Sequence, residues 1–297
     1  MKILDGKAVS LDIKEKIKRN IDNNYLLKNK QAPTLACVIV GENPASKVYV
    51  GSKKKACDFV GFNSIIIELP ENVDYEEIYN TITMLNNDEN VSGILLQLPL
   101  PDNLKIFEKD IIELIDPKKD VDGLTSANLG LLFNGNKIIA PCTASGIIDL
   151  LDYYDIDLDG KNAVVIGRSL LVGKSVAVLL EQKNATVTLC HSHTKNLNEI
   201  TSKADVLIVA MGKPNAITSD MVKNGAIVVD VGINRVDGKI VGDVDFENVS
   251  AKCKYITPVP GGVGPMTIAE LLKNTLKLHE LQQNNKQEYT TKKREIE

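Results

Sequence analysis

Short apolar runs, each about as long as a buried strand, alternate with helix-patterned segments along almost the whole chain. Such continuous apolar runs are typical of parallel-sheet strands that are covered by helices on both faces. The strand candidates in the first half are residues 34–40, 63–69 and 92–100, separated by predicted helices near 44–60 and 74–86. Those in the second half are residues 162–167, 185–190, 204–210 and 225–232. The alternation therefore predicts an α/β architecture with parallel sheets.

The pattern restarts after residue 141, which predicts two domains, as a chain of 297 residues allows. Further on, PGGVGPMT turns sharply toward a last helix, and the capping-box pair Thr267 and Glu270 predicts its start. The polar stretch from residue 286 to 297 has no apolar period. We expect it to be a disordered tail.

Composition narrows the classes of function. The formal net charge is −4, so the chain has no electrostatic basis for binding nucleic acid. Neither a signal-peptide core at the start nor any run of about 18 apolar residues is found, so we expect a cytosolic protein with no membrane partner. The five cysteines are scattered, and His191 and His193 have no third ligand nearby in sequence. No metal site is therefore expected.

The segment ASKVYVGSKKKACDFV places a lysine on the apolar side of its helix. With about 100° per residue, Lys53 lies within about 40° of Tyr49, on the same stripe as Ala45, Ala56 and Val60. One interpretation is that Lys53 lies at the edge of the stripe and extends its ammonium to water. The other is that it lies in a partly dry cleft beside Tyr49 and acts as an acid or base. The spacing leaves both open.

A glycine-containing loop joins a predicted strand to a helix in VVIGRSLLVGKSVAVLL. Gly167 and Gly173 are present, but Ser169 stands where the middle glycine of a dinucleotide fingerprint would be. The next strand ends in CHSHTKN, with no carboxylate for a ribose 2′-hydroxyl. Arg168 and Ser192 could instead bind a 2′-phosphate, which favours NADP over NAD, although Arg168 could also be an ordinary surface charge.

Three other stretches combine features that a simple connector does not need. Gln97 is a polar residue near the end of an otherwise apolar strand, and alone it could be a satisfied core amide. The loop KKDVDGL carries Asp120 and Asp122, each of which could be a turn acid. PGGVGPMTI packs three glycines and two prolines into nine residues, which indicates tight control of the backbone.

Taken together, these motifs resemble the bifunctional methylenetetrahydrofolate dehydrogenase/cyclohydrolase family. The resemblance runs from residue 3 to about residue 280, and it is specific in combination. The motifs that carry it are ILDGK, QLPLP, KDVDG, GRS-x-x-VG, the Gly-Ile-Asn of VGINR, and PGGVGPMT.

The resemblance implies an N-terminal three-layer α/β catalytic domain that binds folate and a Rossmann-like NADP-binding domain with a parallel sheet, with a cleft between them. The folate domain is expected over residues 1–141 and 268–285, because the last helix would return to it. The NADP domain is expected over residues 142–267. The family also implies a homodimer, formed through the cofactor domain.

Site residues follow from the resemblance, motif by motif. Lys53 resembles the catalytic lysine and Tyr49 the tyrosine that stacks on the aminobenzoyl part of folate. Gln97 resembles the amide that orients the lysine. Asp122, rather than Asp120, matches the acid that binds the pterin ring. The residues expected to bind substrate or cofactor elsewhere are Gly167, Arg168, Ser169 and Ser192 at the NADP phosphates, Ile233 near the amide end of the cofactor, and Gly261 and Gly262 lining the cleft.

The resemblance implies oxidation of 5,10-methylenetetrahydrofolate by NADP, followed by hydrolysis of the methenyl product to 10-formyltetrahydrofolate. In this interpretation Lys53 faces inward because its helix lines the cleft. Three alternatives stay open at this point: a dehydrogenase without hydrolase activity, an NADP-dependent oxidoreductase of an unrelated small molecule, and a folate-binding protein without catalysis.

Overall fold

The computed structural model describes residues 1–136 and 138–296, with side chains described through residue 284. By contacts the chain divides into two compact units. We call them the three-stranded unit (residues 13–131 and from 271 on) and the six-stranded unit (residues 1–12 and 132–270), after their main sheets.

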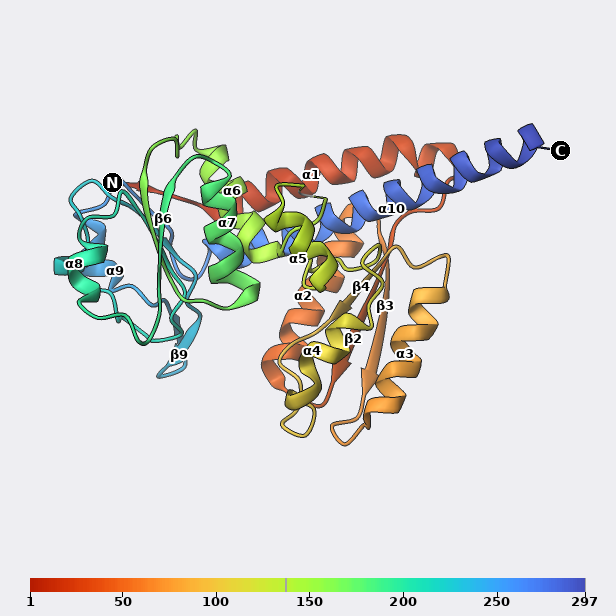
Figure 1. Ribbon diagram of the computed structural model, residues 1–297, viewed down its shortest axis with the longest axis horizontal. Helices are drawn as coiled ribbons and strands as arrows, with labels where there is room; N and C mark the ends of the chain where they lie inside the picture. The colour runs from red at the N-terminus through yellow and green to blue at the C-terminus, as the bar shows by residue number, and fades with distance from the viewer. Residues whose placement is uncertain (137, 297) are drawn as a thin grey trace. The chain divides into compact units, whose positions relative to one another are not determined.

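The three-stranded unit is built on a parallel sheet in the order β3-β2-β4 (Figure 1). The strands are β2 (Thr34–Val40), β3 (Asn63–Leu69) and β4 (Gly93–Leu96), and the helices that follow them are α2 (Pro44–Val60), α3 (Tyr75–Asn87), α4 (Glu108–Glu113) and α5 (Ser126–Phe133). Short 3-10 turns lie at η1 (Leu26–Lys28) and η2 (Lys105–Phe107).

Side chains of β2 alternate between two helical layers, as the period of a strand requires. Ala36, Val38 and Val40 share one core with residues of α3 and α4. Cys37 points to the other face, where α2 packs on β2 and β3. The unit is therefore the expected three-layer α/β structure.

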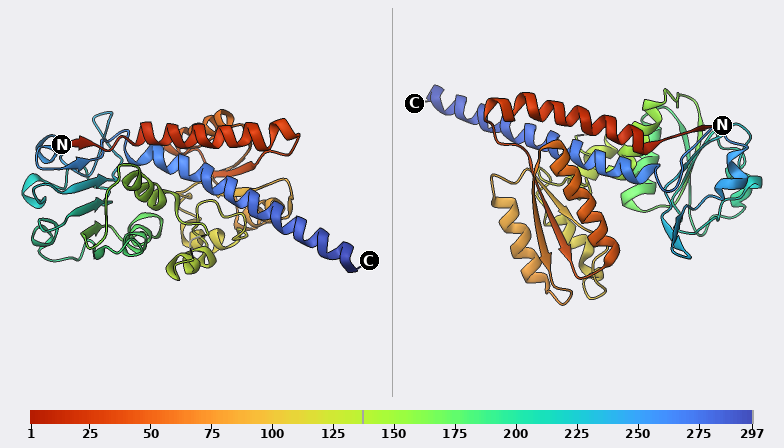
Figure 2. Two further views of the ribbon diagram at one scale, coloured as in Figure 1. Left: turned by 90° about the horizontal axis from the view of Figure 1, so that it is seen from above. Right: turned by 180° about the vertical axis from the view of Figure 1, so that it is seen from behind.

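Two long helices belong partly to this unit, α1 (Gly6–Asn24) and α10 (Val263–Ile296). Figure 2 shows α10 running beside α1. The ring of His279 lies 5.4 Å from that of Tyr25, just beyond the end of α1. His279 Nδ1 also lies 2.9 Å from the hydroxyl of Ser92 at the start of β4. These contacts hold the second part of α10 against the sheet.

The six-stranded unit contains a parallel sheet in the order β1-β11-β8-β7-β5-β6. Its strands are β1 (Lys2–Ile3), β5 (Asn162–Ile166), β6 (Thr186–Cys190), β7 (Val206–Val209), β8 (Ile227–Asp230) and β11 (Tyr255–Ile256). A separate hairpin pairs β9 (Asn234–Val236) with β10 (Lys239–Val241). The strand order reverses between β5 and β7, and open α/β sheets bind ligands at the carboxyl ends of the strands at such a point.

Helices cover both faces of this sheet (Figure 1). On one side lie α8 (Leu197–Thr201) and α9 (Phe246–Ser250), and on the other α6 (Cys142–Tyr153) and α7 (Ser175–Glu181). Short turns are η3 (Leu170–Lys174) and η4 (Ser219–Met221). The doubly covered parallel sheet is the expected Rossmann-like arrangement.

The structure differs from the sequence-based expectations at three places. β1 pairs with β11, so residues 1–12 group with the six-stranded unit instead of with residues 13–131. β4 ends at Leu96 instead of at residue 100, although Gln97 still donates its backbone N–H to Val38 O at 2.8 Å. The last helix begins at Val263, and Thr267 lies inside it, where its hydroxyl is 3.2 Å from that of Thr143.

Three further observations concern the cysteines, membrane-spanning helices and the end of the chain. All five cysteines are free and buried. In the described part of the chain, no helix is both long enough and apolar enough to cross a membrane. α10 continues through Ile296, but side chains beyond residue 284 lie outside the described residues, so the disordered tail stays a prediction.

Candidate functional site

Lys53 lies at the centre of the buried stripe of α2. The helix begins where the Asn43 side chain accepts hydrogen bonds from two backbone N–H groups, with Pro44 in the first turn, and it ends at Gly61 with a φ of 83°. Its buried residues nearest to Lys53 around the axis are Ser46, Val50, Cys57 and Val60. Lys53 itself is half-buried. Packing on β2 and β3 therefore turns its side chain toward the sheet.

The same geometry corrects the predicted stripe. Ala45 and Tyr49, which the spacing placed on the buried side, are exposed, and the exposed fraction of Tyr49 is 39%. The true stripe is rotated toward Ser46 and Val50, so Tyr49 stands at its edge, one turn before Lys53. An exposed ring beside a half-buried amine can stack on a flat ligand.

Gln97 holds the Lys53 ammonium from the end of β4. Its side chain is 8% exposed, and its backbone N–H donates to Val38 O at 2.8 Å, which continues the pairing of β4 with β2. Lys53 Nζ donates to Gln97 Oε1 at 2.8 Å, while Gln97 Nε2 donates to Leu98 O at 2.6 Å. Because the amide nitrogen is engaged with the backbone, only the oxygen faces the lysine.

Cys37 and Asp122 complete this cluster. Burial raises the pKa of the Cys37 thiol to about 11, the charge of Lys53 opposes the rise, and the charge of Asp122 adds to it. Lys53 and Asp122 therefore each lie within electrostatic reach of the Cys37 thiol. No sequence pattern selects Cys37, and its place on the α2 face of β2 brings it to the lysine.

The two acids of the KDVDG loop have different environments. Asp120 is 1% exposed, and its Oδ2 accepts hydrogen bonds from the backbone and hydroxyl of Thr125 and from Asn128 Nδ2, at 2.7–2.9 Å. Asp122 is half-buried. Between them, Val121 O accepts a bond from Asn274 Nδ2 at 2.9 Å. Asp120 thus holds the loop together, and Asp122 is the acid whose charge reaches the Cys37 thiol.

The glycine loop lies in the six-stranded unit, at the end of β5. Gly167 has a φ of 122°, and a Cβ there would lie 2.2 Å from Ala210 O. A Cβ at Gly173 would lie 1.9 Å from Gly167 O. The Ser169 hydroxyl accepts the N–H of Val172 at 3.3 Å and so caps η3. Both glycines are needed because the loop folds back on its own backbone.

Arg168 and Ser192 lie at the ends of neighbouring strands. β5 and β6 are paired with Ile166 opposite Cys190, and Gly167 N donates to Cys190 O at 2.9 Å. Both Arg168 and Ser192 are exposed. Among the side chains that the structure describes, which end at residue 284, Arg168 has no ion-pair partner, so its charge is available to an anion.

The histidines beside Ser192 are used within their own turn. His191 Nδ1 accepts the N–H of His193 at 3.2 Å, and His191 N donates to the Thr194 hydroxyl at 2.9 Å. Within the described residues, no group of three or more His, Cys, Asp or Glu side chains could hold a metal ion.

Ile233, Gly261 and Gly262 also belong to the six-stranded unit. Ile233 follows β8 and its side chain is 50% exposed. Gly261 has a φ of 111°, and its carbonyl accepts the N–H of Lys7 at 2.9 Å. A Cβ at Gly262 would lie 2.7 Å from Pro258 O. The predicted residues thus form two groups, one around Lys53 and one at the carboxyl ends of β5, β6 and β8 and in the 261–262 turn.

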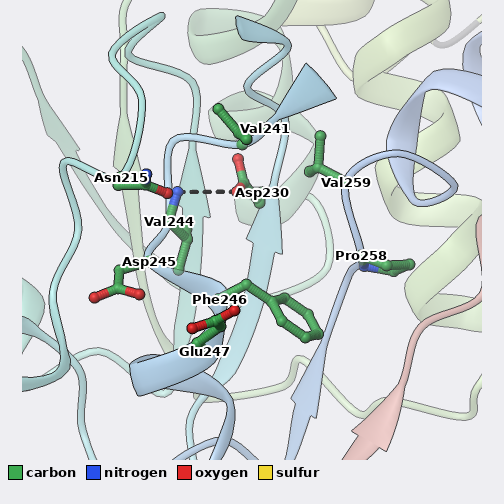
Figure 3. A pocket seen from close by; sticks show the side chains of 10 residues that line it. Asn215, Asp230, Val241, Val244, Asp245, Phe246, Glu247, Pro258 and Val259 are labelled. Atoms are coloured by element: carbon green, nitrogen blue, oxygen red, sulfur yellow. Dashed lines mark hydrogen bonds between the residues drawn. The ribbon is translucent and has the colours of Figure 1, made fainter. Parts of the chain in front are cut away.

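Sequence reasoning missed a hollow of about 480 Å³ in the six-stranded unit, beside the end of β8 (Figure 3). Asp230 lies at its wall and is 3% exposed. Burial raises the pKa of this carboxyl to about 6, against three backbone N–H bonds that lower it, and the charge of Asp243 raises it further. In the sequence Asp230 lies within the predicted strand 225–232 and 13 residues before Asp243, and only the fold brings the two acids together.

Comparison with known proteins gives matches over both units. A family model for the tetrahydrofolate dehydrogenase/cyclohydrolase catalytic domain matches residues 4–122, and one for the NAD(P)-binding domain of the same family matches residues 141–283. The bifunctional protein FolD of Nitratiruptor sp. is 55% identical over 279 residues, which are 93% of this chain and 97% of that protein.

Solved structures are similar over the same length. The bifunctional FolD dehydrogenase/cyclohydrolase from Campylobacter jejuni is 52% identical with a TM-score of 0.91, covering 94% of this chain and 99% of that one. The methylenetetrahydrofolate dehydrogenase-cyclohydrolase from Trypanosoma brucei, in complex with NADP and an inhibitor, is 36% identical with a TM-score of 0.89. That match covers 93% of this chain and 96% of the other.

Proposed function

The chain belongs to the tetrahydrofolate dehydrogenase/cyclohydrolase family, and from this premise we propose that it catalyses both reactions. It oxidises 5,10-methylenetetrahydrofolate to the methenyl form with NADP and hydrolyses that product to 10-formyltetrahydrofolate. Relatives that cover nearly the whole chain carry both activities in their names. The observation that carries the proposal is the Lys53–Gln97 hydrogen bond of 2.8 Å, beside a Cys37 thiol that feels the charges of both Lys53 and Asp122.

The six-stranded unit fits NADP. The amides of the loop after Gly167 begin a helical turn, which suits the pyrophosphate, and Arg168 and Ser192 would hold the 2′-phosphate. Residues 191–196, directly after β6, include no carboxylate, and a site for a 2′-phosphate requires that absence. NADP, when bound, supplies the acceptor for the hydride that leaves the bridging carbon of the folate. Ile233 would contact its amide end through the backbone.

The three-stranded unit supplies the folate contacts. Tyr49 would stack on the aminobenzoyl ring, and Asp122 would bind the pterin ring through its ring nitrogens. Gly261 and Gly262, which belong to the six-stranded unit, would also contact the substrate. In the oxidation, positive charge develops on the folate as hydride leaves, so that step needs positioning of the rings more than a protein base.

The hydrolysis needs a group that takes a proton and returns it. Water adds to the methenyl carbon and loses one proton to Lys53 in its neutral form. The carbon–N5 bond then breaks as Lys53 returns that proton to N5, and the remaining hydroxyl proton leaves to solvent as the formyl C=O forms. Gln97 Oε1 fixes the lysine nitrogen at one position throughout. Asp122, on the same substrate, keeps the reacting carbon beside it.

The Lys53→Met variant tests this assignment, with Lys54→Met as a matched control, because Lys54 is exposed and pairs with Asp58. We expect Lys53→Met to lose methenyltetrahydrofolate hydrolysis by about a hundredfold or more, while NADP reduction survives in part. The methenyl chromophore should then accumulate during turnover. Normal hydrolysis by Lys53→Met would contradict the role of the lysine, and accumulation by the wild type would indicate a dehydrogenase without hydrolase activity.

Two further parts of the proposal rest on the family, for the oligomeric state, and on the sequence, for the location. We expect a homodimer, to be checked by light scattering of the purified protein. We also expect a cytosolic location, to be checked by cell fractionation.

A further inference from the structure

Two buried carboxyl groups meet at the carboxyl ends of the strands in the six-stranded unit. Asp230 is the last residue of β8, and Asp243 follows the β9–β10 hairpin. Their exposed fractions are 3% and 0%. The backbone N–H of Asp243 donates to Asp230 Oδ1 at 3.0 Å, so the two residues are directly linked.

Asp243 accepts hydrogen bonds from the loop that follows β7. Its Oδ2 accepts the backbone N–H groups of Met211 and Gly212, at 2.6 and 2.9 Å, and its Oδ1 accepts that of Lys213 at 2.9 Å. Oδ1 also accepts the side-chain amide of Asn234 at 2.8 Å. One carboxylate therefore joins the end of β7 to the start of β9.

Asp230 holds the start of the neighbouring turn. Its Oδ1 accepts the N–H of Gly232 at 2.9 Å, and its Oδ2 accepts that of Val244 at 2.9 Å (Figure 3). Two glycines make room for these carboxyl groups. A Cβ at Gly232 would lie 2.3 Å from Asp243 Oδ1, and one at Gly242 would lie 1.9 Å from Asp230 Oδ2.

The turn that is held in this way contains Ile233. Asp230 binds the residue before it and Asp243 binds the side chain of the residue after it, while the Ile233 side chain stays half exposed. The loop after β7 also lies close to the glycine loop, because a Cβ at Gly167 would lie 2.2 Å from Ala210 O. Both segments lie where an open α/β sheet receives its ligand.

We propose that Asp230 and Asp243 are positioning residues for NADP: they fix the segments 211–213 and 232–234 that receive its nicotinamide half. The inference rests on the proposed function for the identity of the ligand. Carboxylates suit this task because they only accept hydrogen bonds, and every partner above is an N–H donor. Variants of Asp230 or Asp243 should therefore lose dehydrogenase activity and keep hydrolase activity, because hydrolysis of methenyltetrahydrofolate uses no NADP.

Asp243→Asn in the full chain tests the proposal, because the new NH2 group must face N–H donors in either orientation. We expect the Kd for NADP from calorimetry and the KM for NADP to rise at least tenfold. The hydrolysis of supplied methenyltetrahydrofolate should stay within twofold of wild type. Asp245→Asn is the matched control, since that side chain caps α9 by accepting the N–H of Asn248 and touches neither segment.

A second variant decides the matter if Asp243→Asn does not fold. Asn234→Ala removes one bond to Asp243 and leaves the three backbone bonds in place. We expect a three- to tenfold rise in the Kd for NADP, with faster hydrogen exchange in the peptide that contains residues 232–234.

The outcomes separate the inference from the proposed function. Equal loss of both activities, or a folded Asp243→Asn protein with unchanged NADP binding, would overturn the positioning role. If the wild type failed to oxidise methylenetetrahydrofolate, the proposed function would fall, and the calorimetric comparison of NADP binding would still test the pair.

Discussion

Replacing Asp230 by Asn should change how stability depends on pH. Burial raises the pKa of Asp230 from its ordinary value of 3.8 to about 6, with a further contribution from Asp243. Between these two pH values the folded state keeps the proton and the unfolded state has lost it. The contribution of Asp230 to the free energy of unfolding therefore falls as pH rises through this window, by about 3 kcal/mol in total. Above about pH 7 both states are ionised, and this contribution is constant.

Urea unfolding of the wild type and of Asp230→Asn, measured at intervals from pH 4 to pH 7.5, checks this prediction. At each pH the other titrating groups contribute to both proteins and cancel in the difference. The stability of the wild type relative to the variant should fall as the pH rises from about 4 to about 6 and then level off.

Asp205→Asn is a control of opposite sign in the same unit. The hydrogen bond from Lys223 lowers the pKa of Asp205, so its contribution to stability is present at neutral pH and lost on acidification. Relative to Asp205→Asn, the wild type should therefore gain stability as pH rises. A difference between wild type and Asp230→Asn that stays constant with pH, or that grows in favour of the wild type as pH rises, would refute the argument for Asp230.

Two further predictions concern specificity on each unit. Arg168→Ala should raise the KM for NADP about ten- to a hundredfold, as expected for loss of a charge-assisted hydrogen bond, and leave that for NAD nearly unchanged; an equal effect on both cofactors in steady-state assays would argue against a 2′-phosphate contact. Asp120→Ala should lower the free energy of unfolding by about 1–3 kcal/mol, because three buried donors lose their acceptor. It should also raise the KM for folate and leave that for NADP alone, and a selective effect on NADP would exclude its role in the KDVDG loop.

The elements that were predicted correctly are those fixed by local chemistry. β2 and β3 have the predicted bounds because β2 is a continuous apolar or β-branched run and β3 has three isoleucines at its centre, each strand lying between turn residues. α2 has them because Asn43 and Pro44 begin a helix and Gly61 ends it. Lys53 was also detectable, since helix geometry alone placed a charge on an apolar stripe.

The elements that were missed depend on distant parts of the chain. The position of Gln97 after β4 depends on Lys53, which its side chain bonds although the two lie 44 residues apart in sequence. β1 is a two-residue strand that exists because it pairs with β11 near the other end of the chain. No local pattern encodes a partner that far away in sequence.

The sequence by itself determined the α/β class, the family and the lysine, because apolar period, caps and motifs are local properties. The tertiary structure alone decided which neighbours those residues have. It brought the Cys37 thiol within reach of the charges of Lys53 and Asp122, and it joined Asp230 to Asp243 across the ends of β8 and the hairpin. Hydrogen bonds and electrostatic interactions depend on distance in space, and that distance is fixed only once the sheets have formed.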